Sequence, residues 1–190
     1  PTTRRAGCSV WGNGGAAVIA DCAAESATHT GGVCTRESGA PAIVGTGDNA
    51  SITNSGSIST AGDGAYGIWS TGDNASITNS GSISTAGASA VGIWSEGDNA
   101  RITNNGSIST AGDGAYGIWS TGDNASITNS GSISTTGDGA HSLSARDGSA
   151  SISNYGSTNH KRAGQHEGAA PDAHAGPADH STSTPRSGRS

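Results

Sequence analysis

The sequence predicts an all-β protein, a parallel β-solenoid with 25-residue coils and three short strands in each coil. Three observations predict it: a repeated segment, isoleucines in fixed phases, and alternation of apolar and hydroxyl side chains. The 190 residues include no Phe, no Met and one Leu, too few large apolar residues for a globular core. Only 13% are charged, which argues against a disordered chain. The placement of the apolar residues must therefore create the core.

The repeat is the strongest signal in the sequence. The segment Ala61–Thr85, AGDGAYGIWSTGDNASITNSGSIST, recurs unchanged at Ala111–Thr135, with an altered copy between. Isoleucines then fall into three phases of 25 residues: Ile43, Ile68, Ile93 and Ile118; Ile52, Ile77, Ile102, Ile127 and Ile152; and Ile58, Ile83, Ile108 and Ile133. Leu143 continues the first series. One unit cannot bury three isoleucines alone, but coils stacked about 4.8 Å apart can place each above its counterpart.

Each apolar phase predicts one short strand. Around Ile52 and Ile58, apolar or small residues alternate with Ser and Thr, which is typical of a strand with one dry face. Glycine-rich turns such as 47–49 and 62–64 separate the strands, and no helical apolar stripe exists. Asn recurs at one further position of the 25-residue repeat, and this row predicts a structural ladder of stacked amides at a tight turn. Its members are Asn54, Asn79, Asn104, Asn129 and Asn154.

The repeat divides the chain into three parts. Residues 1–38 are expected to be an irregular N-terminal segment or cap, residues 39–158 the β-solenoid, and residues 159–190 a disordered polar tail. Cys8, Cys22 and Cys34 all precede the repeats. Their odd number predicts either one optional disulfide or three unpaired thiols.

Composition excludes several classes of partner. The formal net charge of -6 offers no basic surface for nucleic acid, and no glycine-rich loop has the pattern that holds nucleotide phosphates. No apolar run is long enough to span a membrane, and no signal peptide is visible in the chain. We therefore expect no cofactor, no nucleic-acid partner and no membrane insertion by this chain, and the oligomeric state is left open.

Near-perfect repetition also argues against an enzyme, because catalysis needs one special group of residues rather than rows of identical ones. The turn aspartates Asp48, Asp73, Asp98 and Asp123 form such a row. Calcium could bridge stacked carboxylates, but the turns lack the GGxGxD pattern of calcium-binding repeats. Solvated turn aspartates are therefore expected, with no catalytic residues and no metal site.

An aromatic stripe is the candidate ligand-binding feature. Each tryptophan directly follows an inward isoleucine, so alternation predicts that it points outward. Its members are Trp69, Trp94 and Trp119, accompanied by Tyr66 and Tyr116. Exposed indoles beside rows of Ser and Thr could stack on a glycan or meet a host-surface protein. The competing interpretation is mutual stacking that only stiffens the shaft.

Units of the form GDNASITNSGSIST followed by GDGAYGIWS resemble the passenger repeats of bacterial autotransporters, over residues 39–156. The resemblance implies a right-handed parallel β-helix, a cell-surface or secreted location and an adhesive role. This chain shows neither the signal peptide nor the C-terminal membrane barrel of that family, so a passenger fragment that mediates adhesion or acts as a spacer is expected. The alternatives are an ice-binding β-solenoid, suggested by flat Ser/Thr arrays, and a polysaccharide-active β-helix enzyme.

Overall fold

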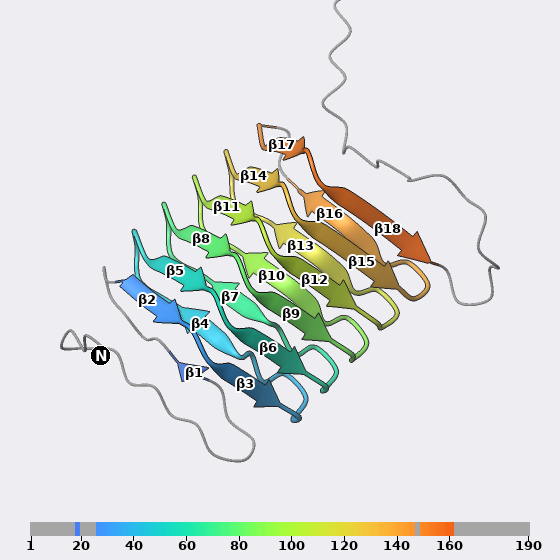
Figure 1. Cartoon of the computed structure of the whole chain (residues 1–190). Helices are drawn as coiled ribbons and strands as arrows, with labels where there is room; N and C mark the ends of the chain where they lie inside the picture. Colours follow the sequence, from blue (N-terminus) through green and yellow to red (C-terminus); the bar gives the residue numbers. More distant parts are fainter. Residues whose placement is uncertain (1–17, 20–25, 147–148, 162–190) are drawn as a thin grey trace, which may run out of the picture.

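The computed structural model describes residues 18–19, 26–146 and 149–161, and within these ranges every regular element is a β-strand. The strands form three parallel sheets that run along a common axis, as Figure 1 shows. Each strand pairs with the strand 25 residues away in the neighbouring coil, for example Ile93 with Ile68 and Ile118. The fold is the predicted parallel β-solenoid, with about five turns, about 25 residues per coil and three strands per coil.

The three sheets each take one strand from every coil. Sheet 1 contains β1 (Val18–Ile19), β4 (Ile43–Gly45), β7 (Ile68–Ser70), β10 (Val91–Ser95), β13 (Tyr116–Ser120) and β16 (His141–Ala145). Sheet 2 contains β2 (Ser26–His29), β5 (Ser51–Asn54), β8 (Ser76–Asn79), β11 (Arg101–Asn104), β14 (Ser126–Asn129) and β17 (Ser151–Asn154). Sheet 3 contains β3 (Gly32–Thr35), β6 (Ser57–Thr60), β9 (Ser82–Thr85), β12 (Ser107–Thr110), β15 (Ser132–Thr136) and β18 (Ser157–Lys161).

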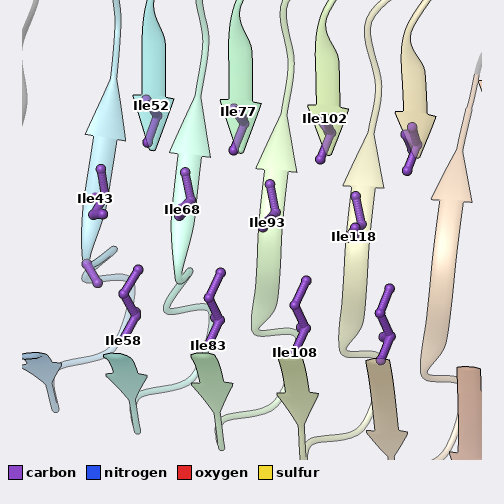
Figure 2. Close-up of a cluster of buried hydrophobic side chains, with 13 residues drawn as sticks. Ile43, Ile52, Ile58, Ile68, Ile77, Ile83, Ile93, Ile102, Ile108 and Ile118 are labelled. Atoms are coloured by element: carbon purple, nitrogen blue, oxygen red, sulfur yellow. The ribbon is translucent and has the colours of Figure 1, made fainter. Parts of the chain in front are cut away.

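The core consists of three columns of isoleucine side chains, one from each sheet, which converge on the axis (Figure 2). Ile68, Ile77 and Ile83 belong to one coil and are at most 1% exposed. Buried alanines at the turns, such as Ala75, fill the corners between the columns. At about 25 cal/mol per Å² of apolar surface, each enclosed isoleucine contributes roughly 2–3 kcal/mol. A thin core of three large residues per coil therefore holds the stack together.

The turns need residues that accept a left-handed backbone. The turn between sheets 1 and 2 places Asn49, Asn74, Asn99 and Asn124 at φ between 54° and 60°. The turn between sheets 3 and 1 uses Gly64 (φ 61°) and Gly114 (φ 64°) for the same purpose. In this conformation the backbone N–H of the turn residue points along the axis, as in Asn74 N–H, which donates to Asp98 O at 2.7 Å. Asn and Gly are the residues that adopt this region at least cost.

The stack begins before residue 39, where the sequence predicts its start. Strands β1, β2 and β3 lie within residues 1–38 and pair in parallel with β4, β5 and β6. Val18, Ala27 and Val33 occupy the three isoleucine phases there. This part of the N-terminal segment is a further coil rather than irregular chain, because smaller apolar residues keep the alternation without Ile.

At the other end, β18 continues to Lys161, with Thr158 in the isoleucine phase opposite Ile133. Residues 159–161 of the predicted disordered tail, 159–190, therefore belong to a strand, and the tail from residue 162 onward lies outside the described residues. Cys8 and Cys22 also lie outside them, while Cys34 is a free, exposed thiol. No described helix has the length and apolar character that crossing a membrane would require.

Candidate functional site

The aromatic stripe lies on the outer side of sheet 1, and the strand pairing aligns its members. Trp94 stands opposite Trp69 in β7 and Trp119 in β13. The isoleucine before each tryptophan is fully buried and the serine after it is also buried, so the indole points outward, as alternation predicts. The indoles are nevertheless half-buried rather than exposed. They cover one another along the axis.

The indole rings are stacked nearly parallel. The ring centroids of Trp69 and Trp94 are 5.8 Å apart at an interplanar angle of 19°, and those of Trp94 and Trp119 are 5.1 Å apart at 9°. Both faces of Trp94 are therefore covered by neighbouring indoles. The Nε1 atoms of Trp69 and Trp94 are buried and have no hydrogen-bond partner. The stripe consequently presents ring edges, rather than open ring faces, to solvent.

The two tyrosines of the stripe adopt different orientations. Tyr116 is stacked on Trp119 (4.9 Å, 16°) and on His141 of the next coil (5.2 Å, 22°). Tyr66 instead lies steeply across the indoles, at 4.8 Å and 78° to Trp94. The difference follows from the next coil, where the counterpart of Tyr66 is Val91, which offers no ring to stack on and is itself buried.

Glu96 adds a carboxylate to this part of the stripe. It follows Ser95 at the end of β10 and is half-buried, where Thr71 and Thr121 stand in the flanking coils. Burial, and secondarily the negative charge of Glu96, raise the pKa of Tyr66 above its ordinary value of 10.0. Glu96 makes no ion pair with exposed Arg101 or with any other described residue.

The asparagine phase forms a continuous ladder at the turn between sheets 2 and 3. Nδ2 of Asn54 donates to Oδ1 of Asn79 at 2.8 Å, and the bond recurs at 2.8 Å up to Asn154. Asn54, Asn79, Asn104 and Asn129 are 0% exposed. A side chain without access to solvent cannot bind a ligand, so the ladder serves the structure of the turn.

The aspartate rows are bound to the backbone. Oδ1 of Asp73 accepts the backbone N–H of Asp98 at 2.9 Å, and Asp98 does the same for Asp123 at 2.8 Å. In the second row, Asp113 accepts from Asp138 at 2.8 Å. The backbone N–H groups lessen the repulsion between stacked carboxylates. No group of three or more His, Cys, Asp or Glu suited to a metal ion occurs in the described part of the chain.

Sequence reasoning missed two features of this surface. One is the hydrogen bond that a backbone N–H of the next coil donates to the turn aspartates, for which the repeat showed only the row of aspartates. The bond is formed at Asp48, Asp63, Asp73, Asp98 and Asp113. The other is the grouping of Tyr66 with Glu96, for which the departures at Val91 and Glu96 from the repeated letters were the available signal. Comparing the sequences of the coils identifies Val91 and Glu96 as departures, but it does not predict how the ring of Tyr66 is oriented.

A family described as the BigA third pectate lyase-like domain matches residues 4–156 of the chain. The matched span includes all of the aromatic stripe and almost all of the described solenoid. No curated protein and no solved structure gives a significant match.

Proposed function

The chain belongs to the BigA third pectate lyase-like domain family, and from that premise we propose that it is a non-enzymatic, adhesin-like β-solenoid of the bacterial surface. BigA is an autotransporter-like adhesin, which supports a bacterial surface or secreted protein here. The finer proposal is that the chain is part of an autotransporter passenger, displayed outside the outer membrane. There the stiff shaft holds a contact surface away from the cell.

The aromatic stripe of sheet 1 is the observation that carries the adhesive role. It concentrates five Trp and Tyr rings and His141 on one side of a rigid stack of coils. Aromatic side chains supply large contact areas at little cost in conformational entropy. Because the rings present edges, a protein surface suits the stripe better than a sugar ring, which needs an open aromatic face. We propose a host-surface protein as the partner, with a glycan as the alternative.

A non-enzymatic role is supported by how the carboxylates are used. Asp48, Asp73 and Asp98 each accept the backbone N–H of the next aspartate in their row, so their hydrogen bonds distinguish no pair among them. Paired carboxylates in different environments are what glycan hydrolysis requires. The family description, with its pectate lyase-like term, still makes turnover of a polysaccharide the activity to test first.

The proposal is tested by displaying the purified chain on beads and measuring how strongly the beads bind to host cells and to a glycan panel. We expect Trp94→Ala to reduce bead binding by about tenfold, because a central aromatic anchor contributes on the order of 1.4 kcal/mol or more. Ser109→Ala on the outer side of β12 is the matched control and should leave binding unchanged, because Ser109 is exposed on sheet 3. Circular dichroism of both variants checks that the solenoid persists.

Three outcomes would replace this proposal with another. If Trp94→Ala keeps the circular dichroism spectrum of the solenoid and still adheres, the aromatic stripe is not a binding surface, and a spacer is the role that remains. Turnover of a polysaccharide by the purified chain would establish the enzyme. Thermal hysteresis of its solutions would favour the ice-binding alternative, in which the outer Ser and Thr rows of sheets 2 and 3 order water.

A further inference from the structure

The two ends of the described stack are open. Strands β16, β17 and β18 form the last described coil, and each is the end strand of its sheet. Strands β1, β2 and β3 are the end strands at the opposite end (Figure 1). Among the described strands, each of these six therefore pairs along one edge only. The other edge carries backbone N–H and C=O groups in the spacing that a further parallel strand would need.

The inward side chains of the end coils are incompletely buried. Ile152 of the last coil is half-buried, whereas its counterpart Ile127 is 0% exposed, and Leu143 is half-buried as well. At the other end Val33 is half-buried, whereas its counterpart Ile58 is 2% exposed. The apolar columns are thus enclosed only where a coil lies on both sides. Each end presents apolar surface that a further coil would bury.

The asparagine ladder makes the two ends unlike. Nδ2 of Asn129 donates to Oδ1 of Asn154 at 2.8 Å, and the earlier bonds of the ladder run in the same direction. Asn154 is exposed, so the ladder ends on an open amide donor. At the opposite end His29 occupies this phase, in register with Asn54, and a neutral imidazole has a nitrogen that can accept. A head-to-tail junction gives the open amide an acceptor, whereas two like ends would set donor against donor.

We propose that a second copy of this chain stacks head to tail on the last described coil, with its own first described coil following β16, β17 and β18 in register. The three apolar columns then continue across the junction. By the phases of the strand pairing, Val18 follows Leu143, Ala27 follows Ile152 and Val33 follows Thr158. Because the junction joins unlike ends, it repeats, and the product is a filament rather than a closed dimer. This inference concerns assembly and does not depend on the proposed adhesive function.

The contact between coils inside the chain is the reason for choosing a second copy as the partner. The segments 61–85 and 111–135 are identical, yet each stacks between different neighbours. The contact therefore depends on the phases of a coil rather than on one particular partner. The sequence after residue 161 offers no such phases, because it contains no Ile, Leu or Val. Gly168 and Pro177 stand 25 residues after the inward Leu and Ile of the last coil.

A disulfide between copies tests the register of the junction. In the stacked arrangement Asn159 of β18 lies beside Cys34 of the next copy, because both belong to one exposed phase of sheet 3. Neighbouring strands are about 4.8 Å apart, a Cα spacing that a disulfide spans. The test variant is Asn159→Cys, and the matched control Ser109→Cys places a thiol in the same phase at the middle of the shaft. Cys8→Ser and Cys22→Ser in both chains leave Cys34 as the single native thiol.

Oxidised glutathione should link the Asn159→Cys chains into a series that extends beyond the dimer on non-reducing electrophoresis. The yield of linked chains should exceed that of Ser109→Cys by about tenfold, because stacking raises the effective concentration of the two thiols to the millimolar range. Peptide mapping should join the segment around position 159 to the segment around Cys34. Equal yields from the two variants, or links from Cys34 to Cys34 alone, overturn the proposal.

Reversible association provides the second test, on the end face itself. Sedimentation velocity of the reduced chain should show a weight-average mass that rises with concentration. Ile152→Lys places a charge on the apolar end face and should weaken association by about tenfold or more. Ser151→Lys places the same charge on the outer side of β17, in the phase where β11 already carries Arg101, and should change association by less than about twofold.

Circular dichroism of both lysine variants checks that the coils persist. A reduced chain that stays monomeric at every concentration contradicts the stacked arrangement. Equal association of Ile152→Lys and Ser151→Lys contradicts it as well, because the copies would then meet through a surface other than the end of the stack.

Discussion

Asn104 and Asn105 are neighbours in the chain but have opposite surroundings. Asn104 is fully buried, donates to Oδ1 of Asn129 and accepts from Nδ2 of Asn79, each at 2.8 Å. Asn105 is exposed and stands where the two neighbouring coils have Ser80 and Ser130. A buried amide that loses its partner costs more than the bond itself contributes, because the remaining group has no water to replace it.

Replacing Asn104 by Ala should therefore lower the free energy of unfolding by about 2–4 kcal/mol, because it breaks two buried bonds and leaves Asn79 with an unpaired donor. The control Asn105→Ser introduces the residue of the neighbouring coils and should change stability by less than about 0.5 kcal/mol. Urea unfolding followed by circular dichroism measures both. Equal stability of the two variants would show that the ladder does not stabilise the turn.

Ser89 is the one left-handed turn residue in the described ranges that is neither Asn nor Gly. Its φ is 54°, whereas the equivalent Gly64 and Gly114 adopt the same region without a side chain. Ser89→Gly should raise the free energy of unfolding by about 1 kcal/mol, because the left-handed conformation is costly for residues with a Cβ. Ser89→Ala keeps the Cβ and should give no gain. Thermal unfolding of both variants checks the prediction, which fails if they melt together.

Tyr66 gives stability an alkaline dependence. Burial, and then Glu96, raise its pKa in the folded state, so the folded protein holds this proton more tightly than the unfolded chain. The resulting stabilisation is present below the ordinary pKa of 10.0 and decreases as pH rises from there through the folded-state pKa. Glu96→Thr should move the pKa of Tyr66 back toward its ordinary value, measured by ultraviolet titration of the phenolate. An unchanged titration in that variant would contradict the assignment of Glu96 as a cause.

At the scale of the elements, the sequence predicts the strands of the repeated coils well, because each strand from β4 to β15 contains a single buried isoleucine. The three phases locate β5, β6 and β7 and their counterparts, and the Asn phase locates one of the turns. The strands β2 and β3 escape this reasoning because Ala27 and Val33 replace Ile. Alternation predicts the correct side of the strand for the tryptophans, but the burial of their rings depends on packing between coils, which the order of residues within one coil does not encode.

Three successive coils have a glycine at one corner of sheet 1, namely Gly67 just before β7, Gly92 as the second residue of β10 and Gly117 as the second residue of β13. A Cβ on Gly92 would lie 2.5 Å from Cγ2 of Ile108 and 2.5 Å from the carbonyl oxygen of Gly117. Gly92→Ala should therefore lower the free energy of unfolding by about 1–3 kcal/mol through overpacking. Gly114→Asn is the matched control, because Asn124 adopts φ 54° in a similar turn of the same chain, and it should cost less than about 1 kcal/mol. Denaturant unfolding measures the loss of unfolding free energy in each variant, and equal losses would contradict the steric argument.

At the scale of the whole molecule, the stack is built from nearest-neighbour contacts along one axis. Each coil touches only the coils before and after it, through the register of 25 residues seen in every strand pair. Stability is then close to a sum of contributions from coils and from the interfaces between them. A coil is consequently the smallest unit that can be removed without changing the register of the rest.

Removal of residues 86–110, one complete coil, joins Thr85 to Ala111 and keeps every phase of the repeat. We expect the shortened chain to retain its β spectrum, with the urea m-value reduced by about a fifth because one of about five coils is gone. Asn79 would then bond to Asn129, and Trp69 would stack on Trp119.

The matched control is a deletion one residue shorter, residues 78–101, which joins Ile77 to Ile102 within a strand. Two adjacent isoleucines cannot both point inward, because successive side chains of a strand face opposite sides. This variant should lose cooperative unfolding and aggregate, although it retains more residues than the first. If both deletions unfold with equal cooperativity, register between coils does not hold the molecule together, and the stability of the stack must come from elsewhere.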